Sequence, residues 1–217
     1  MIKAIIFDMD GLLIDSEPLW AEAELNAFIA VGVPLTLEMT KQTMGLRIDE
    51  VVQHWFAQYP WDKLSKKEVE SIIVKNVIEL VKEKGVSRDG VNEIIELFSK
   101  ANLPMSIASS SQTEIINAVM EKLQIADRMK VVYSAEHESY GKPHPGVYIT
   151  TAGKLEIFPE NCLALEDSPN GVLAAKAAKM KCIAVPDEKM KGDKRFAIAD
   201  TMLNSLLDFR LEMLKHL

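Results

Sequence analysis

The stretch AIIFDMDGLLIDSE, residues 4–17, decides the fold class. An apolar run from Ala4 to Phe7 ends in two aspartates, Asp8 and Asp10, which are separated by one methionine and followed by a glycine. Residues i and i+2 of an extended chain point to the same side, so both carboxylates are aimed at one spot beyond a buried strand. Like charges this close repel each other unless a cation or a shared proton offsets them. The stretch therefore predicts a strand end that binds a cation or shares a proton.

The rest of the chain falls into two zones with different patterns. Residues 17–85 show helical spacing without a convincing strand, and the segment 65–85 opens with the capping box Ser65-x-x-Glu68. From residue 86 onward helices and strands alternate, which indicates a mainly parallel sheet with helices on its faces. The expected helices are 90–102, 113–124, 145–155 and 169–179, and the strands that follow them are 104–109, 130–135, 162–167 and 181–186.

These patterns predict an α/β fold, with a Rossmann-like doubly wound parallel sheet as its core and an inserted helical-bundle cap. The core is expected to comprise residues 1–16 and 86–217, and the cap residues 17–85.

Composition and charge exclude several classes of protein. The net charge of −7 and the lack of a long basic cluster argue against nucleic acid as a partner. The apolar runs are too short to span a bilayer, and no leader-like segment precedes the first strand. Cys162 and Cys182 lie in apolar strand-like runs without metal-ligand spacing. We expect a cytoplasmic monomer without disulfides that binds neither nucleic acid nor a membrane.

Polar groups that suit an anion and a hard cation follow the predicted strands. Ligands of open parallel sheets bind beyond the carboxyl ends of the strands. The groups found there are Asp8 and Asp10, the serines 109–111, Lys142 in the loop after the third strand, and Glu166 with Asp167. Carboxylates hold Mg²⁺ together with water and phosphate oxygens, and amides at a helix start bind phosphate. The strand ends therefore predict Mg²⁺ and a phosphoryl group.

Each of these groups also has a plainer explanation when it is taken alone. An Asp-x-Asp-Gly turn is often a loop or half of a calcium site, although the remaining calcium-loop ligands are missing here. Ser111 and Ser168 suit helix N-caps, and Lys142 suits a solvated loop. The conjunction of all these groups at strand ends favours a functional site.

The motifs FDMDGLLIDSE, IASSS, GKPHP and ALEDSPNG resemble the four successive motifs of the haloacid dehalogenase-like hydrolases. The resemblance covers the whole chain, and the helical zone is similar to the small cap of the β-phosphoglucomutase-like branch. The segments DSEPLW, GLRIDEVV and SAEHESYGKPHPGVY resemble the phosphatases that act on 2-deoxyglucose 6-phosphate and hexitol phosphates. The resemblance implies a Mg²⁺-dependent phosphatase for small sugar phosphates such as hexose or hexitol 6-phosphates.

The resemblance also implies a role for each motif residue. Asp8 would attack phosphorus and become an aspartyl phosphate, and Asp10 would protonate the leaving alcohol and then activate water. Mg²⁺ would be held by the Asp8 carboxylate, the Asp10 main-chain carbonyl and Asp167, with Glu166 near or behind it. The phosphate oxygens would be bound by Ser109, Ser110 and Lys142.

Selectivity is expected to come from the cap, because the core treats any phosphomonoester alike. Gly45 permits a sharp turn, and Arg47 after it could reach the core and bind sugar hydroxyls or phosphate. Glu17 and Trp20 could line the opposite wall. The alternatives are that Arg47 is a solvated residue at a helix start and that Trp20 packs the cap helix.

Three other functions remain open from the sequence. Enzymes similar to this chain that act as β-phosphoglucomutases carry histidine at the position of Trp20, which favours hydrolysis over a phosphomutase reaction. A phosphatase for another metabolite is the second alternative. The third is a phospho-accepting receiver module, but a receiver is a single uncapped domain and lacks the i, i+2 aspartate pair.

Overall fold

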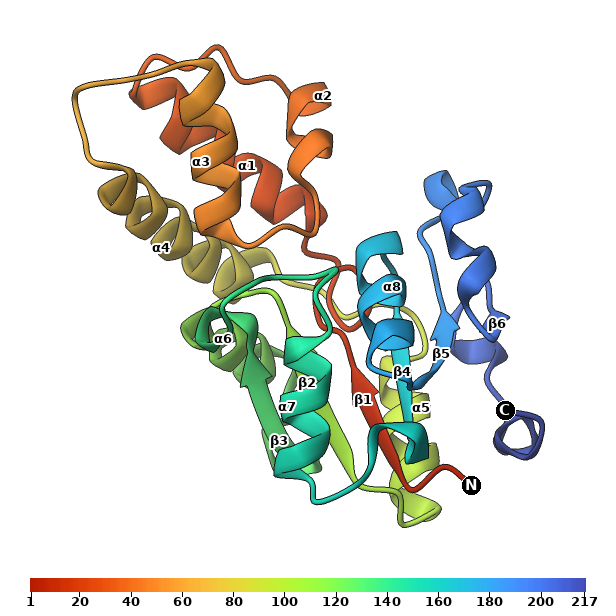
Figure 1. The fold of residues 1–217 in the computed structure, drawn as a ribbon. Coiled ribbons are helices and arrows are strands. Elements are labelled where there is room, and N and C mark those ends of the chain that lie inside the picture. Colours follow the sequence, from red (N-terminus) through yellow and green to blue (C-terminus); the bar gives the residue numbers. More distant parts are fainter.

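The computed structural model describes all 217 residues. Six parallel strands form one sheet in the order β3-β2-β1-β4-β5-β6 (Figure 1). Their bounds are β1 Ala4–Phe7, β2 Met105–Ser109, β3 Met129–Ser134, β4 Cys162–Glu166, β5 Lys181–Ala184 and β6 Thr201–Met202. The predicted α/β class with a parallel sheet is confirmed. Strand β6 was not predicted, because two residues are too few to show a periodic pattern.

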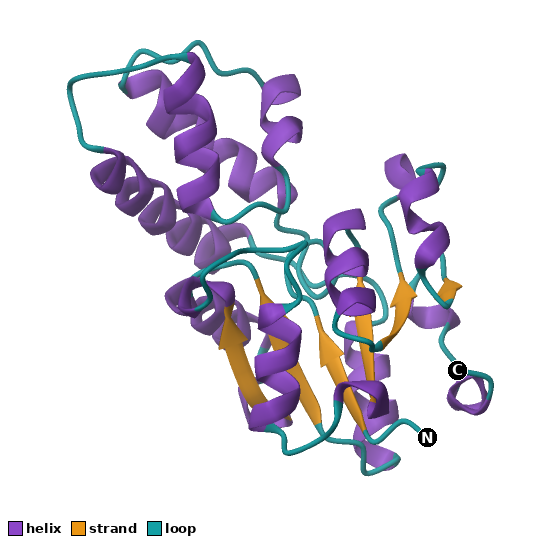
Figure 2. Cartoon of the chain, viewed as in Figure 1, coloured by secondary structure: helices purple, strands orange, loops and turns teal.

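Helices cover both faces of the sheet (Figure 2). They are α5 Val91–Lys100, α6 Thr113–Leu123, α7 Gly146–Lys154 and α8 Pro169–Ala177. Successive residues of β1 belong to two separate apolar clusters: Ile5 and Phe7 pack with residues of α5 and α6, and Ala4 and Ile6 with residues of α7 and α8. A strand buried on both faces needs a continuous apolar run, which is the pattern that β1 has. The sheet is therefore doubly wound, as predicted.

The register of the central strands fixes where the first motif ends. Phe7 of β1 lies opposite Ile107 of β2 and opposite Leu165 of β4. The residues that follow these three strands therefore lie side by side at the carboxyl edge of the sheet.

Four helices lie beyond that edge of the sheet, in the upper part of Figure 1: α1 Glu17–Ala30, α2 Leu37–Thr40, α3 Ile48–Gln58 and α4 Lys66–Lys84. Helix α4 begins with the predicted capping box, in which the Glu68 amide donates to Ser65 Oγ at 3.2 Å and the Ser65 amide donates to Glu68 Oε2 at 2.7 Å. Helix α2 was not predicted, since a single turn started by the Thr36 cap carries no periodicity.

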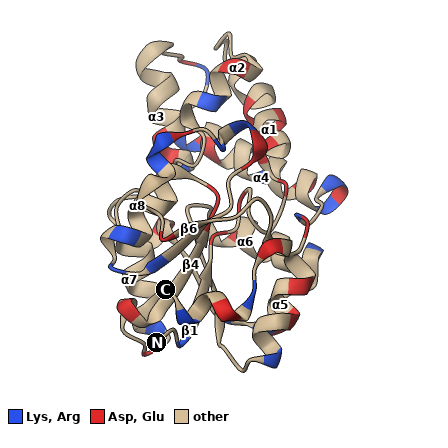
Figure 3. Cartoon of the chain, turned by 90° about the vertical axis from the view of Figure 1, so that its right-hand side faces the viewer, with Lys and Arg blue, Asp and Glu red and all other residues tan.

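Acidic and basic residues are interspersed along the helices of both parts in the side view of Figure 3. None of the helices combines the length and the apolar character that crossing a bilayer requires.

Candidate active site

A cavity of about 410 Å³ lies between the carboxyl edge of the sheet and the cap helices. The core lines it with Asp8, Asp10, Ser110, Ser111, Lys142 and Asp167, and the cap with residues that include Glu17, Trp20, Glu24, Thr43, Leu46 and Val51. This volume lies within the roughly 300–1,000 Å³ that is usual for small-molecule sites. Most of the polar groups predicted at the strand ends therefore line one shared cavity, and Ser109 and Glu166 lie outside its lining.

Lys142 joins the first, third and fourth motifs. Its Nζ donates to Asp8 Oδ1 at 2.6 Å and to Glu166 Oε1 at 2.7 Å, and also contacts the Ala108 carbonyl at 3.1 Å. Burial lowers the pKa of Lys142, but the charges of Asp8 and Glu166 and their hydrogen bonds to the lysine together outweigh burial and raise the pKa above its ordinary value. The lysine is thus a fixed positive charge beside Asp8 and is not a solvated loop residue.

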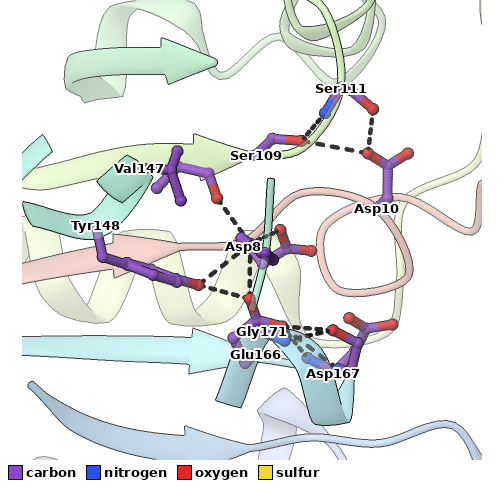
Figure 4. Close-up of polar contacts among 12 residues, drawn as sticks. Asp8, Asp10, Ser109, Ser111, Val147, Tyr148, Glu166, Asp167 and Gly171 are labelled. Carbon is purple, nitrogen blue, oxygen red and sulfur yellow. Dashed lines mark hydrogen bonds and ion pairs between the residues drawn. The ribbon is translucent and has the colours of Figure 1, made fainter. Parts of the chain in front are cut away.

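Glu166 fixes the position of Lys142 and is itself held by hydrogen bonds to both of its carboxylate oxygens. Its Oε1 accepts from Lys142 and, at 2.6 Å, from the Tyr148 hydroxyl (Figure 4). Its Oε2 accepts from the Asp167 and Ser168 amides and from the Ser168 hydroxyl at 3.2–3.3 Å. A Cβ at Gly171 would overlap the Glu166 carboxylate, so only glycine fits there. Because both oxygens are already occupied, Glu166 is better suited to positioning its neighbours than to binding a metal directly.

Asp8, Glu166 and Asp167 form a cluster that could hold a metal ion. One carboxylate oxygen from each lies within 4.8 Å of the others. Gly11 has φ +75°, and a Cβ at this position would overlap the Asp167 carboxylate. This glycine therefore allows Asp167 to approach the loop after β1.

The electrostatics of the cluster suit a divalent cation. Burial raises the pKa of Asp8 to about 8, with Lys142 opposing the rise and Glu166 and Asp10 adding to it. Burial and the charge of Asp8 raise the pKa of Asp167 well above its ordinary value. A divalent cation favours the ionised form of nearby carboxylates and so offsets both effects. Hard oxygen ligands of this kind are the ones that Mg²⁺ prefers.

The Asp10 carboxylate accepts four hydrogen bonds. Ser16 Oγ and Trp20 Nε1 donate to Oδ1 at 2.7 and 2.9 Å. Ser111 Oγ and Ser109 Oγ donate to Oδ2 at 2.7 and 3.3 Å (Figure 4). Trp20 lines the cavity and also holds Asp10 in position through this hydrogen bond. The sequence did not reveal the contributions of Ser16 and Ser111: Ser111 suited a helix N-cap, and Ser16 was not singled out.

The three serines at the end of β2, Ser109 to Ser111, have different environments. Ser109 Oγ accepts from the Ser111 amide at 3.0 Å and donates to Asp10, and Ser109 does not line the cavity. The Ser110 hydroxyl lies buried at the cavity without any hydrogen-bond partner. A buried hydroxyl without a partner is rare and is suited to receive a ligand oxygen. Of the two serines predicted to bind phosphate, Ser110 is the one whose hydroxyl is free.

Arg47 reaches the core, but its guanidinium does not line the cavity. Its Nη1 donates to the main-chain carbonyls of Ala135 and Glu138 at 3.1 and 2.8 Å, and Asp49 accepts from Nε and Nη2. A Cβ at Gly141 would come within 2.9 Å of the Arg47 side chain. In this structure Arg47 therefore ties the cap to the loop that carries Lys142, and its role toward a substrate stays a prediction. The sequence could not show this, since main-chain carbonyls of a distant loop leave no pattern.

Two acidic residues of α1 line the cavity. Glu17, which was predicted there, is half-buried, and burial together with the charge of Asp187 raises its pKa. Glu24, which was not predicted, is buried in the cap wall. Its position could have been inferred, because residues i and i+4 of a helix share a face and Glu24 follows Trp20 at that spacing.

Comparison with known proteins places these features in a family. Residues 5–185 match the model of the haloacid dehalogenase-like hydrolases. Hexitol phosphatase B of Escherichia coli (strain K12) is 43% identical over 208 residues, covering 95% of this chain and 94% of that protein. A phosphorylated carbohydrates phosphatase of Thermotoga maritima is 30% identical over 185 residues and 84% of each chain. The crystal structure of CbbY from Rhodobacter sphaeroides in complex with phosphate has a TM-score of 0.88 at 26% identity, covering 96% of each chain. These matches confirm the resemblance read from the four motifs, and the chain belongs to the haloacid dehalogenase-like hydrolase family.

Proposed function

We propose that this phosphomonoesterase hydrolyses small sugar phosphates, namely hexose or hexitol 6-phosphates, with the help of Mg²⁺ and through an aspartyl phosphate on Asp8. The observation that carries the proposal is the position of Asp8. It lies beside Lys142 and lines, on the core side, a cavity of about 410 Å³ that the cap covers. A cavity of this size suits a small leaving group. The 43% identity to a hexitol phosphatase supports a polyol or sugar as that group.

Asp8 is proposed as the nucleophile. Lys142 donates to its Oδ1, and Oδ2 accepts no hydrogen bond, so this oxygen is available to attack phosphorus. The attack forms a bond between the carboxylate and phosphorus as the bond to the leaving alcohol breaks. Covalent catalysis of this kind divides one difficult displacement into two easier ones. Lys142 and the free hydroxyl of Ser110 are placed to bind the phosphate oxygens.

Asp10 is proposed to move the protons. It gives a proton to the leaving alcohol in the first step and takes one from water in the second, as general acid and then general base. Its carboxylate is held by Ser16, Trp20, Ser109 and Ser111 in this structure. Proton transfer to the substrate therefore requires the Asp10 side chain to break at least one of these four hydrogen bonds.

The residues present fit a Mg²⁺ ion, which Asp8 and Asp167 would hold through their carboxylates and Asp10 through its main chain, with Glu166 behind them. When bound, the ion supplies the positive charge that phosphoryl transfer needs to offset the charge on the phosphate oxygens.

Hydrolysis is favoured over transfer between two positions of a sugar. No histidine lines the cavity, and the place where β-phosphoglucomutase-like enzymes carry one is taken by Trp20, which binds Asp10. A phosphomutase would convert one sugar phosphate into another and leave inorganic phosphate constant.

The test is a screen of hexose, hexitol and nucleoside monophosphates for release of inorganic phosphate, with Mg²⁺ and with EDTA. We expect the highest kcat/KM for hexose or hexitol 6-phosphates, loss of activity in EDTA and recovery when Mg²⁺ is added. Asp8→Asn should fold like the wild type and lack turnover, because an amide is a poor nucleophile. Turnover of Asp8→Asn near the wild-type rate, or full activity after exhaustive chelation, would refute the mechanism.

A further inference from the structure

Glu24 is a buried carboxyl group for which the fold provides no partner. It lies on α1, one turn beyond Trp20, and is 6% exposed. Its Oε2 is buried without a hydrogen-bond partner, and no hydrogen bond or ion pair reaches either of its oxygens. Buried polar groups are nearly always satisfied, so each exception calls for a physical reason.

Two other buried carboxylates of the chain show what a structural role looks like. Glu70, on cap helix α4, is 8% exposed and pairs with Lys67 Nζ at 2.9 Å. Glu166 is fully buried, and five donors bind its two oxygens. No hydrogen bond or neighbouring charge offsets the cost of burying the Glu24 carboxyl group in this way. This indicates that its partner is not a residue of the chain.

The side chain lines the cavity on its cap side. Leu46 and Val51, which also line the cavity from the cap, are apolar, and the hydroxyl of buried Thr43 already donates to the Thr40 carbonyl at 3.2 Å. The phosphate-binding groups, Lys142 and Ser110, come from the core. A substrate with its phosphate on Asp8 would therefore present its leaving group to the cap side, where Glu24 supplies an unused polar group.

We propose that Glu24 binds a hydroxyl group of the leaving group and so makes the enzyme selective for polyol and sugar phosphates over phosphomonoesters without hydroxyls. This inference rests on the proposed function, since it assigns the leaving-group end of the same site. A site built to hydrogen-bond a substrate hydroxyl discriminates strongly against analogues that lack it, because its own polar group is then left unpaired.

The protonation state of Glu24 agrees with this role. Burial raises its pKa to about 8, so the group is mostly uncharged at neutral pH. An uncharged carboxyl group both donates and accepts a hydrogen bond, as a hydroxyl does. It also adds no negative charge to a cavity that receives an anionic phosphate ester.

The test compares two substrates that differ in the leaving group: sorbitol 6-phosphate, which is rich in hydroxyls, and phenyl phosphate, which has none. The readout is the selectivity ratio, which is kcat/KM for sorbitol 6-phosphate divided by kcat/KM for phenyl phosphate. In Glu24→Met, which keeps the length of the side chain and removes its polar atoms, we expect the ratio to fall at least tenfold. Glu24→Gln keeps a donor and an acceptor and should stay within about threefold of the wild type.

Glu22→Gln is the matched control, because Glu22 lies on the same helix with its side chain 45% exposed and paired with Lys84. Its ratio should equal that of the wild type. If Glu24→Met does not fold, as judged by circular dichroism, Glu24→Ala takes its place. A ratio in the apolar variant within twofold of the wild type would overturn the assignment of Glu24.

A binding measurement separates this inference from the proposed function. Calorimetry with sorbitol 6-phosphate compares Asp8→Asn, which binds without turnover, with the double variant that also carries Glu24→Met. We expect the Kd to rise about tenfold in the double variant. If the wild type releases no phosphate from either ester, the proposed function fails, and the Kd comparison still decides the role of Glu24: an equal Kd rejects it.

Discussion

Glu24 leads to a prediction about stability that does not depend on any substrate. Its pKa is 4.5 in a solvated chain and about 8 in the folded protein, because burial favours the uncharged form. Between these two values the folded state keeps the proton and the unfolded state loses it. The unfolded state therefore binds fewer protons in this range, and the free energy of unfolding falls as the pH rises from about 4.5 to 8.

The size of the effect follows from the two pKa values. Each pH unit between them changes the free energy of unfolding by up to about 1.4 kcal/mol. The full interval from 4.5 to about 8 gives a ceiling of about 5 kcal/mol, and water that enters the cavity will reduce it. Glu24→Gln cannot ionise and should lose none of this stability, so it should become more stable than the wild type as the pH rises.

Urea unfolding of both proteins at pH 5, 6, 7 and 8, followed by circular dichroism in EDTA, measures this difference. Asp8 and Asp167 also have raised pKa values, but they are present in both proteins and cancel in the comparison. We expect the stability of Glu24→Gln relative to the wild type to increase by about 2–3.5 kcal/mol from pH 5 to pH 8. A relative stability that is constant over this range would show that Glu24 is solvated or paired, and would refute the reasoning.

Three further predictions concern the rest of the site. Mg²⁺ should raise the Tm of the wild type, because a ligand that binds only the folded state stabilises it. The rise in Tm should be smaller in Asp167→Asn, and an equal rise in both proteins would place the ion elsewhere. Gly171→Ala should lower the free energy of unfolding by about 2 kcal/mol or more and lower kcat, since the new methyl group overlaps the Glu166 carboxylate. Gly153→Ala is the control in the same urea unfolding experiment: its Cβ meets open space, so the free energy of unfolding should rise by roughly 0.5–1 kcal/mol. Arg47→Ala should lower the free energy of unfolding by about 1–3 kcal/mol and reduce kcat/KM for sorbitol 6-phosphate and phenyl phosphate by the same factor, because it removes a contact between cap and core; a loss confined to sorbitol 6-phosphate would instead make Arg47 a substrate-binding residue.

The core half of the site could be predicted because the backbone positions it. Parallel strands with continuous apolar runs must pair side by side, and their carboxyl ends then meet at one edge. Phe7 lies opposite Ile107 and Leu165, so whatever follows β1, β2 and β4 is brought together by the sheet alone. For this reason Asp8 and Asp167 could be assigned to one site before any side-chain contact was known.

The cap half could not be predicted in the same way, because side-chain packing between distant segments positions it. The sequence predicted neither the hydrogen bond from the Trp20 indole N–H to Asp10 nor the bonds from Arg47 to carbonyls 88 and 91 residues away. Glu24 shows the limit most clearly. In the segment AEAEL it reads as a solvated helix residue, and only the packed structure shows a carboxyl group that is buried and unpaired. A sequence pattern reveals groups whose partners are set by local spacing or by strand order. A group whose partner is a substrate becomes visible only once every partner within the chain has been counted. The spacing from Trp20 indicates where Glu24 lies but not that it lacks a partner, and this is why the packed structure was needed for the inference about selectivity.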